Sequence, residues 1–227
     1  MTDSTTLQPI GKLLEIMAVL RSPEGCQWDR QQTPQSLKPY ILEEAYELLE
    51  AIDQGNPHEI CDELGDLLLQ VVFQAQIFTE SGDFTIKDVA DAISSKLKRR
   101  HPHIFATATD EGHQQRWEKI KLQERAERGK SNKIADRIPT TLPALKRAEK
   151  LLKKTTPKGS YTSTAEVITH LELLQQISDT EACNKSELEA AFGHLLMSIS
   201  CLAQTMGIDA EDSLRMKTNQ MIEAIDN

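Results

Sequence analysis

The sequence has few aromatic residues, no closely spaced cysteines and no long apolar run. Its four cysteines, Cys26, Cys61, Cys183 and Cys201, lie far apart, so neither a zinc site built on Cys-x-x-Cys nor a dense disulfide framework is predicted. No stretch reaches the ~18 consecutive apolar residues of a membrane-spanning helix. The N-terminus lacks the basic start and apolar run of a signal peptide. We therefore expect a cytoplasmic protein with no membrane partner.

The sequence also has no excess of positive charge. The formal net charge is −9, with 35 acidic against 26 basic residues. Binding to DNA or RNA depends on neutralising phosphates, so no nucleic-acid partner is expected. An anionic ligand would need cations or a local basic patch to mediate its binding to this chain.

Long alternating runs of β-branched residues are absent, whereas the helix formers Leu, Ala, Glu, Lys and Gln dominate. This composition predicts an all-α fold. A length of 227 residues is enough for one large domain or two small ones. A polar loop is expected over residues 21–33, and Pro102 is expected to end a helix. The helices expected in the first half cover, approximately, residues 8–20, 35–54, 58–80, 85–100 and 114–129.

The second half of the chain resembles the first. The segment ELGDLLLQVVFQAQ at 63–76 aligns without gaps on AFGHLLMSISCLAQ at 191–204. The identical pairs are Gly65/Gly193, Leu67/Leu195, Leu68/Leu196, Ala75/Ala203 and Gln76/Gln204. Such a repeat predicts a duplicated helical domain. With a proline-containing linker at 131–143, we expect one domain over residues 8–130 and a second over residues 134–227.

Acidic residues on the second expected helix form the first candidate site. Glu43, Glu44, Glu47 and Glu50 share one arc of this helix, at about 100° per residue. A solvated acidic face on an amphipathic helix also explains this arc. The arc alone therefore does not separate a binding site from an ordinary surface.

The next helix carries two further acids in an unusual setting. Glu63 and Asp66 lie one turn apart in a segment that is apolar around nearly its whole circumference, which is typical of a buried helix. A buried carboxylate is costly unless a cation neutralises it. Either Arg or Lys partners or a bound metal ion would satisfy this requirement.

Taken together, the pattern is Glu-Glu-x-x-Glu at 43–47 followed by Glu-x-x-Asp at 63–66. Two antiparallel helices joined by the turn at 55–57 can bring these acids face to face. Four or five carboxylates without His or Cys suit hard cations, magnesium or manganese, better than zinc. A ferritin-like di-iron centre would need Glu-x-x-His on its helices, and that motif does not occur.

A basic cluster complements the acids. Lys96, Arg99 and Arg100 lie within one turn, and Trp117 precedes Lys121 by four residues on a later helix. Cations at a helix C-terminus are also favourable without any ligand. Beside a carboxylate cage, however, they match what a metal–polyphosphate substrate needs, and an indole can stack on a base. Neither a P-loop nor a nucleophile elbow occurs, which favours attack by a metal-activated water.

These residues resemble a known family. The segments LRSPEGCQWDRQQT, LKPYILEEAYELLEAID, DELGDLLLQVVFQAQ, KLKRRHPHIF and RWEKIK are similar, in unbroken order from about Leu13 to Glu127, to the MazG nucleoside triphosphate pyrophosphohydrolases. The resemblance implies the all-α pyrophosphatase fold, a homodimer or larger assembly, and cleavage of nucleoside triphosphates to monophosphate and pyrophosphate. It also implies magnesium as the cofactor, with manganese as a substitute.

The resemblance assigns roles residue by residue. The expected magnesium ligands are Glu44, Glu47, Glu63 and Asp66, with Glu43 as a supporting or water-orienting acid. The expected phosphate-binding residues are Lys96, Arg99, Arg100 and Lys121. Trp117 would line the nucleotide site. Neither the preferred base nor the preferred sugar is predicted.

The second half departs from the family pattern. In the repeat alignment, Glu63 becomes Ala191 and Asp66 becomes His194. The acids of the preceding helix fall on Thr169, His170 and Leu173, with only Glu172 nearby. These side chains cannot form a carboxylate cage, so the second domain is expected to be degenerate. The alternative for the whole chain is a catalytically idle helical module that senses nucleotides or binds a partner.

Overall fold

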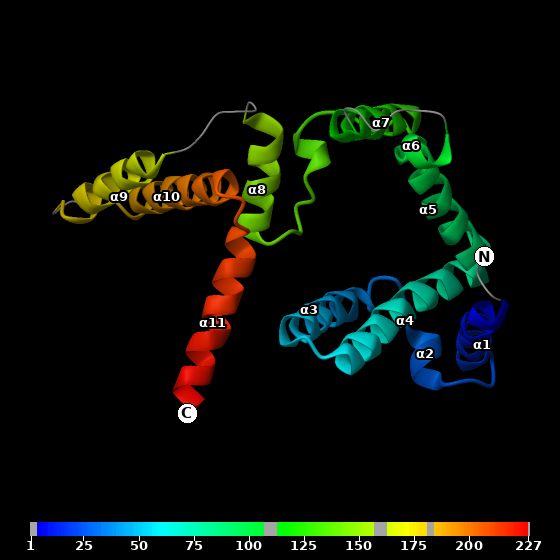
Figure 1. Ribbon diagram of the computed structural model, residues 1–227. Coiled ribbons are helices and arrows are strands. Elements are labelled where there is room, and N and C mark those ends of the chain that lie inside the picture. The colour runs from blue at the N-terminus through cyan, green and yellow to red at the C-terminus, as the bar shows by residue number, and fades with distance from the viewer. Residues whose placement is uncertain (1–3, 107–112, 157–162, 181–183, 227) are drawn as a thin grey trace. The chain divides into compact units, whose positions relative to one another are not determined.

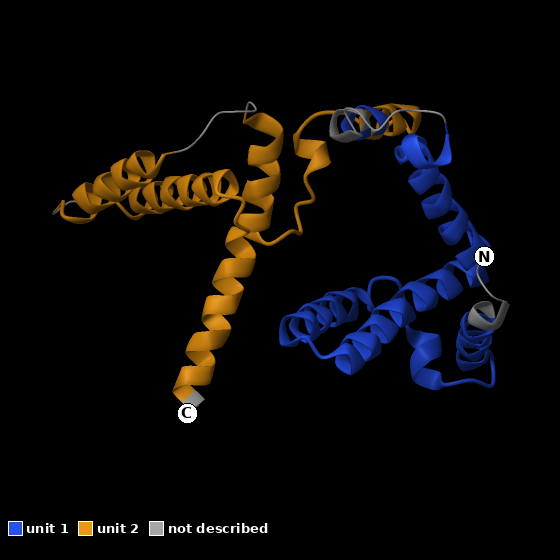
Figure 2. Ribbon diagram, in the orientation of Figure 1, with its two compact units in different colours: residues 1–120 blue, residues 121–227 orange. Residues whose placement is uncertain are grey.

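The computed structural model describes residues 4–106, 113–156, 163–180 and 184–226 (Figure 1). Within these residues all regular structure is helical, in agreement with the predicted all-α fold. The chain divides into two compact units, residues 1–120 and 121–227 (Figure 2). This division lies inside a helix, ahead of the linker at 131–143 where the sequence predicts the domain boundary.

The first unit is built around an antiparallel helix pair, α3 and α4, which lie side by side (Figure 1). Helix α1 packs on α4, and α5 begins beside the C-terminal end of α4. The helices that begin in this unit are α1 (Ser4–Leu20), α2 (Gln27–Gln31), α3 (Lys38–Gln54), α4 (Pro57–Ser81), α5 (Ile86–Arg100), α6 (Pro102–Phe105) and α7 (His113–Glu127).

The residues of the turn between the two helices determine where α3 ends and where α4 begins. α3 ends at Gly55, whose φ of 73° is readily adopted by glycine, and the N–H of Gly55 donates to carbonyls of the last helical turn. The Asn56 side chain then accepts a hydrogen bond from the backbone N–H of His58 at 3.1 Å and caps α4. Pro57 occupies the first turn of α4, where a missing N–H costs nothing. This tight connection fixes which faces of the two helices meet.

The core of the first unit lies between α1 and α4. Met17, Leu37, Val72 and Phe73 are buried together. The partly buried side chains packed against them are Leu13, Leu14, Leu69 and Ile77. These residues hold one face of α4 in place and leave the rest of its surface to other partners.

Three local expectations are corrected. The expected loop at 21–33 contains α2, where Trp28 packs edge-on against Phe73 with ring centroids 6.5 Å apart. α3 begins at Lys38 rather than near residue 35. Pro102 does not simply end a helix: after α5 ends at Arg100, Pro102 starts the short helix α6, a position that suits proline.

The sequence predicts that α4 is buried around nearly its whole circumference, and this prediction is wrong for the single chain. Leu64, Leu68 and Val71 on α4 are 51%, 41% and 43% exposed, and Asp66 is exposed as well. The other α4 face carries the core residues described above. The apolar residues around α4 therefore provide more packing surface than the contacts within one chain cover.

The second unit contains a similar antiparallel pair, α9 (Thr164–Ser178) and α10 (Lys185–Thr205). Leu174, Ala191 and Leu195 form its core. The remaining elements are η1 (Ala135–Arg137), α8 (Ala144–Thr155) and α11 (Ala210–Asp226). Within the described residues, no single helix has the length and apolarity to cross a membrane. α10 and α11 meet those criteria only as a pair bent by 102°.

Candidate metal centre

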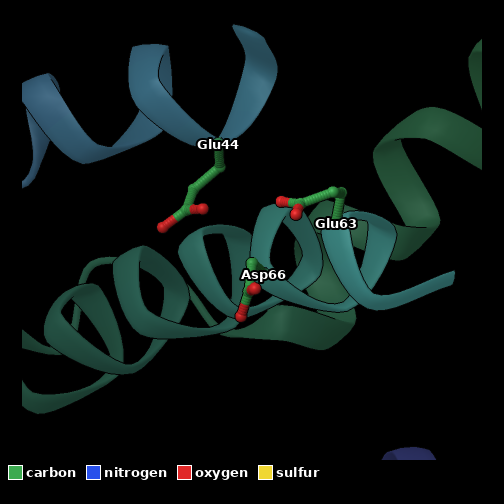
Figure 3. Close-up of side chains that lie close together, drawn as sticks. All are labelled: Glu44, Glu63 and Asp66. Carbon is green, nitrogen blue, oxygen red and sulfur yellow. The ribbon is translucent and has the colours of Figure 1, made fainter. Parts of the chain in front are cut away.

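Three carboxylates from the paired helices α3 and α4 lie close together. Glu44 extends from α3, and Glu63 and Asp66 extend from one face of α4 (Figure 3). One oxygen from each lies within 4.8 Å of the others. The three-residue spacing places the two α4 acids on neighbouring turns. The antiparallel pairing then brings Glu44 opposite them, as the sequence pattern predicted.

The acids repel one another. Partial burial is the largest cause that raises the pKa of Glu44, followed by the charges of Asp66 and Glu47. Burial again comes first in raising the pKa of Glu63, followed by the charges of Glu47 and Asp66. Glu47 is exposed, but its effect on both groups places it next to the cluster. Glu43 is exposed, and the three-carboxylate cluster does not include it.

Among the residues that the structure describes, none of the three clustered acids forms an ion pair with Lys or Arg. The Oε2 atom of Glu63 is buried without a hydrogen-bond partner in the same part of the chain. A buried carboxylate oxygen of this kind needs a cation or a donor. A set of hard oxygen donors with such an atom fits magnesium or manganese.

Gln70 is a site residue that the sequence reasoning missed. It is 6% exposed and lies one turn after Asp66 on α4. Its Nε2 donates to Oε1 of Glu44 at 3.4 Å. The i,i+4 spacing from Asp66 was the available signal, but a neutral amide in an apolar helix does not stand out as a ligand neighbour.

The basic residues lie at the far end of α5. Lys96, Arg99 and Arg100 occupy its last turns. α5 contacts α4 at its start and then leads away from the α3–α4 pair (Figure 1). Within one chain, the basic cluster and the acids are therefore not brought together.

Trp117 packs against Arg100 of the basic cluster and against the residue that follows it. The guanidinium of Arg100 lies over its indole, 5.5 Å from the ring centroid. The imidazole of His101 meets the same ring edge-on at 5.3 Å, a contact that the sequence reasoning did not foresee. Lys121 follows in α7 as a partly buried residue of the second unit.

The corresponding positions of the second unit hold imidazoles. His170 on α9 and His194 on α10 have nearly parallel rings, 10° apart, with centroids separated by 6.1 Å. Ala191, the counterpart of Glu63, is buried in the core of this unit. Across the described residues, the group of Glu44, Glu63 and Asp66 is the one cluster of three or more metal-ligating side chains.

Comparisons with known proteins show which family this chain resembles. Residues 32–105, which include α3, α4 and α5, match the family described as the MazG nucleotide pyrophosphohydrolase domain. The chain is 44% identical over 220 residues to the nucleoside triphosphate pyrophosphohydrolase/pyrophosphatase MazG of Thermotoga maritima, covering 93% of this chain and 82% of that protein. It is 40% identical over 228 residues to the nucleoside triphosphate pyrophosphohydrolase of Escherichia coli K12, covering 96% and 85%.

Proposed function

Since the chain belongs to the MazG family of nucleotide pyrophosphohydrolases and is a nucleoside triphosphate hydrolase, we propose that the Glu44–Glu63–Asp66 cluster is its magnesium-dependent active site. The observation that carries the proposal is the convergence of three carboxylates from two helices, within 4.8 Å and without a basic partner in the described residues. The reaction splits the α–β phosphoanhydride and releases nucleoside monophosphate and pyrophosphate.

The proposal divides the acids into metal ligands and one supporting residue. Glu44, Glu47, Glu63 and Asp66 hold magnesium, or manganese in its place. When bound, such cations neutralise phosphate charge and lower the pKa of water. Glu43, on the same arc of α3, supports the cluster and orients the attacking water. Gln70 fixes the carboxylate of Glu44 through its hydrogen bond. The carboxylates can act at neutral pH because a cation offsets their mutual repulsion.

The basic residues complete the substrate site. Lys96, Arg99, Arg100 and Lys121 bind the phosphates through charge-assisted hydrogen bonds, and Trp117 lines the nucleotide site. A guanidinium clamp stabilises negative charge that builds up on the phosphates in the transition state. Because α5 leads away from the α3–α4 pair, we propose that this cluster serves the acids of a second copy in a homodimer.

An exposed apolar face supports the homodimer. The side chains on this face are Leu42, Tyr46, Leu49 and Ile52 of α3 with Leu64, Leu68 and Val71 of α4, all between 41% and 59% exposed. Several exposed apolar side chains on one helix pair are typical of a protein–protein interface. Two such pairs can pack as a four-helix bundle with two-fold symmetry.

The activity is tested by incubating the protein with the common ribo- and deoxyribonucleoside triphosphates and magnesium, with EDTA-treated samples as the control. Chromatography should show monophosphate and pyrophosphate as the first products, and EDTA should abolish turnover. A diphosphate as the primary product would contradict the proposed cleavage position. No turnover with any nucleotide would favour the catalytically idle module.

The shared site is tested by mixing two impaired variants at an ATP concentration below the wild-type KM. Asp66→Asn removes an acid and Arg100→Ala removes a phosphate ligand, so each homodimer is impaired. After subunit exchange, half of the dimers are mixed, and one of their two sites has both groups intact. Turnover should recover to about a quarter of the wild-type value. No recovery, although exchange is verified by differently tagged copies, would place both groups in one chain's site.

A further inference from the structure

Two imidazoles lie next to each other on the helix pair of the second unit. His170 belongs to α9 and His194 to α10, and their ring centroids are 6.1 Å apart. Leu174, one turn after His170, and Ala191, one turn before His194, are both buried in the core between these helices. The packing of α9 on α10 therefore holds the two rings together.

The two histidines stand at positions that correspond to acids of the proposed metal centre. In the repeat alignment, His170 takes the place of Glu44 and His194 the place of Asp66. The helix arrangement that brings two carboxylates together in the first unit thus brings two imidazoles together in the second. The change of donor atoms changes the ions that suit these positions. Neutral imidazole binds zinc, nickel and copper well, whereas magnesium prefers oxygen.

The ring of His170 contains a polar atom without a partner. Its Nδ1 is buried and has no hydrogen-bond partner in the part of the chain that the structure describes. His194 is exposed, and none of the described residues forms a hydrogen bond or an ion pair with it. A buried ring nitrogen of this kind is uncommon, because it costs free energy until a hydrogen-bonding group or a cation satisfies it. Protein hydrogen bonds therefore do not compete with a ligand for these rings.

The separation of the rings fits a shared ion. Two imidazoles that each bind one ion through a nitrogen at about 2.0–2.1 Å have centroids roughly 5–6.5 Å apart, depending on the angle at the ion. The observed 6.1 Å lies within this range. Among the described residues, no third acid, cysteine or histidine joins the pair to form a larger cluster. Water molecules would therefore complete the coordination of the ion.

We propose that His170 and His194 together bind one divalent transition-metal ion, zinc in preference to magnesium, and that this ion bridges α9 and α10. One nitrogen of each ring binds the ion. An ion that binds the paired helices but not the separated ones stabilises the pair by mass action. The site is separate from the cluster of Glu44, Glu63 and Asp66, and it does not depend on the function proposed for that cluster.

Zinc titrations in excess magnesium test the site in the full chain. The magnesium competes at the carboxylate cluster but not at the imidazoles. Calorimetry should show that the wild type binds one zinc ion whose affinity falls at least about tenfold in His170→Asn and in His194→Asn. His58→Asn, which changes an exposed histidine of α4, is the matched control and should retain that ion. Wild-type zinc binding in folded His170→Asn and His194→Asn would overturn the proposal.

A second pair of histidines provides a sharper control. The rings of His101 and His103 lie 5.8 Å apart, but Nδ1 of His101 already donates to the carbonyl of Leu97 at 2.8 Å. The same ring packs edge-on against Trp117. His103→Asn should therefore leave zinc binding unchanged. Loss of the zinc ion in His103→Asn, with retention in His170→Asn, would move the site to the first unit and overturn the proposal.

Copper(II) reports the donor atoms directly. With one equivalent of copper and excess magnesium, electron paramagnetic resonance of the wild type should show coupling to two imidazole nitrogens. His194→Asn should reduce this to one at most, and this variant should fold because His194 is exposed. Coupling to one imidazole or to none in the wild type would overturn a shared ion.

Hydrogen exchange tests whether the ion bridges the two helices. Zinc at about ten times its dissociation constant should slow exchange roughly tenfold for amides of α9 and α10 that open when the pair separates. His170→Asn should show no such slowing under the same conditions. Zinc binding without protection of α9 and α10 in the wild type would overturn the bridge. Protection that persists in His170→Asn would overturn the assignment of His170.

Discussion

Arg21 and Glu80, 59 residues apart in the sequence, form a two-point ion pair. Nε and one terminal nitrogen of Arg21 donate to the two carboxylate oxygens of Glu80 at 2.8 and 2.7 Å. The same guanidinium also donates to the backbone carbonyl of Asp29 and lies over the ring of Phe73, 5.4 Å from its centroid. One side chain thus ties the end of α1 and the segment around α2 to the last turn of α4.

Replacing Glu80 with Gln should lower the free energy of unfolding by about 1–2 kcal/mol, since the side chain of Arg21 is only 6% exposed and loses its charged partner. The hydrogen bonds from Arg21 hold the pKa of Glu80 below its usual value of 4.5. The stabilisation is therefore present above pH 4.5 and is lost as the pH falls through the lowered pKa. Urea unfolding at several pH values measures this difference.

The control for this pair is Lys87 and Asp91 on α5, which form an exposed ion pair at 2.6 Å. Asp91→Asn should change the free energy of unfolding by less than about 0.5 kcal/mol, because exposed pairs contribute little. Equal effects of Asp91→Asn and Glu80→Gln at neutral pH would show that the Arg21 contact does not anchor the segment around α2.

Asp66→Asn should reduce turnover by at least about 100-fold, because it removes a carboxylate from the proposed metal centre. The metal-free variant should melt no lower than the wild type, since the substitution relieves repulsion with Glu44 and Glu63. Asp62→Asn, an exposed acid of the same helix outside the three-carboxylate cluster, is the control and should retain activity. Near-wild-type turnover in folded Asp66→Asn would contradict the site.

The pKa values of Glu44 and Glu63 are raised from 4.5 by burial and by neighbouring carboxylates. The folded state therefore binds more protons than the unfolded state just above pH 4.5, and this contribution to stability falls as the pH rises. In EDTA, we expect Glu44→Gln to melt roughly 2 °C above the wild type at pH 7, with the difference shrinking toward pH 4.5. Calorimetric melting curves test this, and magnesium should remove the advantage.

Arg100→Ala should raise the KM for ATP by about tenfold or more while leaving the affinity for manganese unchanged, because its guanidinium is assigned to phosphate. The side chain also packs on Trp117, so the variant's fold is verified by its melting temperature. Lys98→Ala, an exposed neighbour on α5, serves as the control. A large loss of manganese affinity in Arg100→Ala would move this residue into a structural role.

The α3–α4 pair could be predicted closely from the sequence. Gly55 marks the end of one helix and Pro57 the start of the next, because both residues have strong backbone preferences. Once the turn is known, helical spacing alone brings Glu44 opposite Glu63 and Asp66. The backbone preferences of the turn residues and the helical spacing of the acids were therefore enough to predict the part of the site that two adjacent helices form.

Other features depend on contacts that spacing does not report. The apolar circumference of α4 predicted complete burial, yet Leu64 and Leu68 remain exposed, since periodicity does not say whether the burying partner is the same chain or another. The sequence did not single out Gln70, because the role of its amide depends on the contact with Glu44, which residue spacing does not specify. The packing of His101 on Trp117 depends on the break between α5 and α6, which sequence spacing did not specify.

The second unit should be catalytically silent. Its α9–α10 pair retains the apolar packing of Leu174 and Leu195, but His170 and His194 stand where the sequence alignment places Glu44 and Asp66. Packing constrains the core volume even when a binding site is not used. Two imidazoles without carboxylates suit hard cations poorly, because magnesium prefers oxygen ligands.

Three proteins test this assignment. Full-length Asp66→Asn should show no residual turnover attributable to the second unit. A fragment from about residue 134 onward should hydrolyse no nucleotide, with circular dichroism confirming that it is helical. A fragment ending near residue 133 keeps α7 whole and should retain turnover if it still dimerises. Hydrolysis of any nucleoside triphosphate with magnesium by the fragment from about residue 134 would refute the assignment, because only α8 to α11 and the preceding linker would be present to carry the reaction.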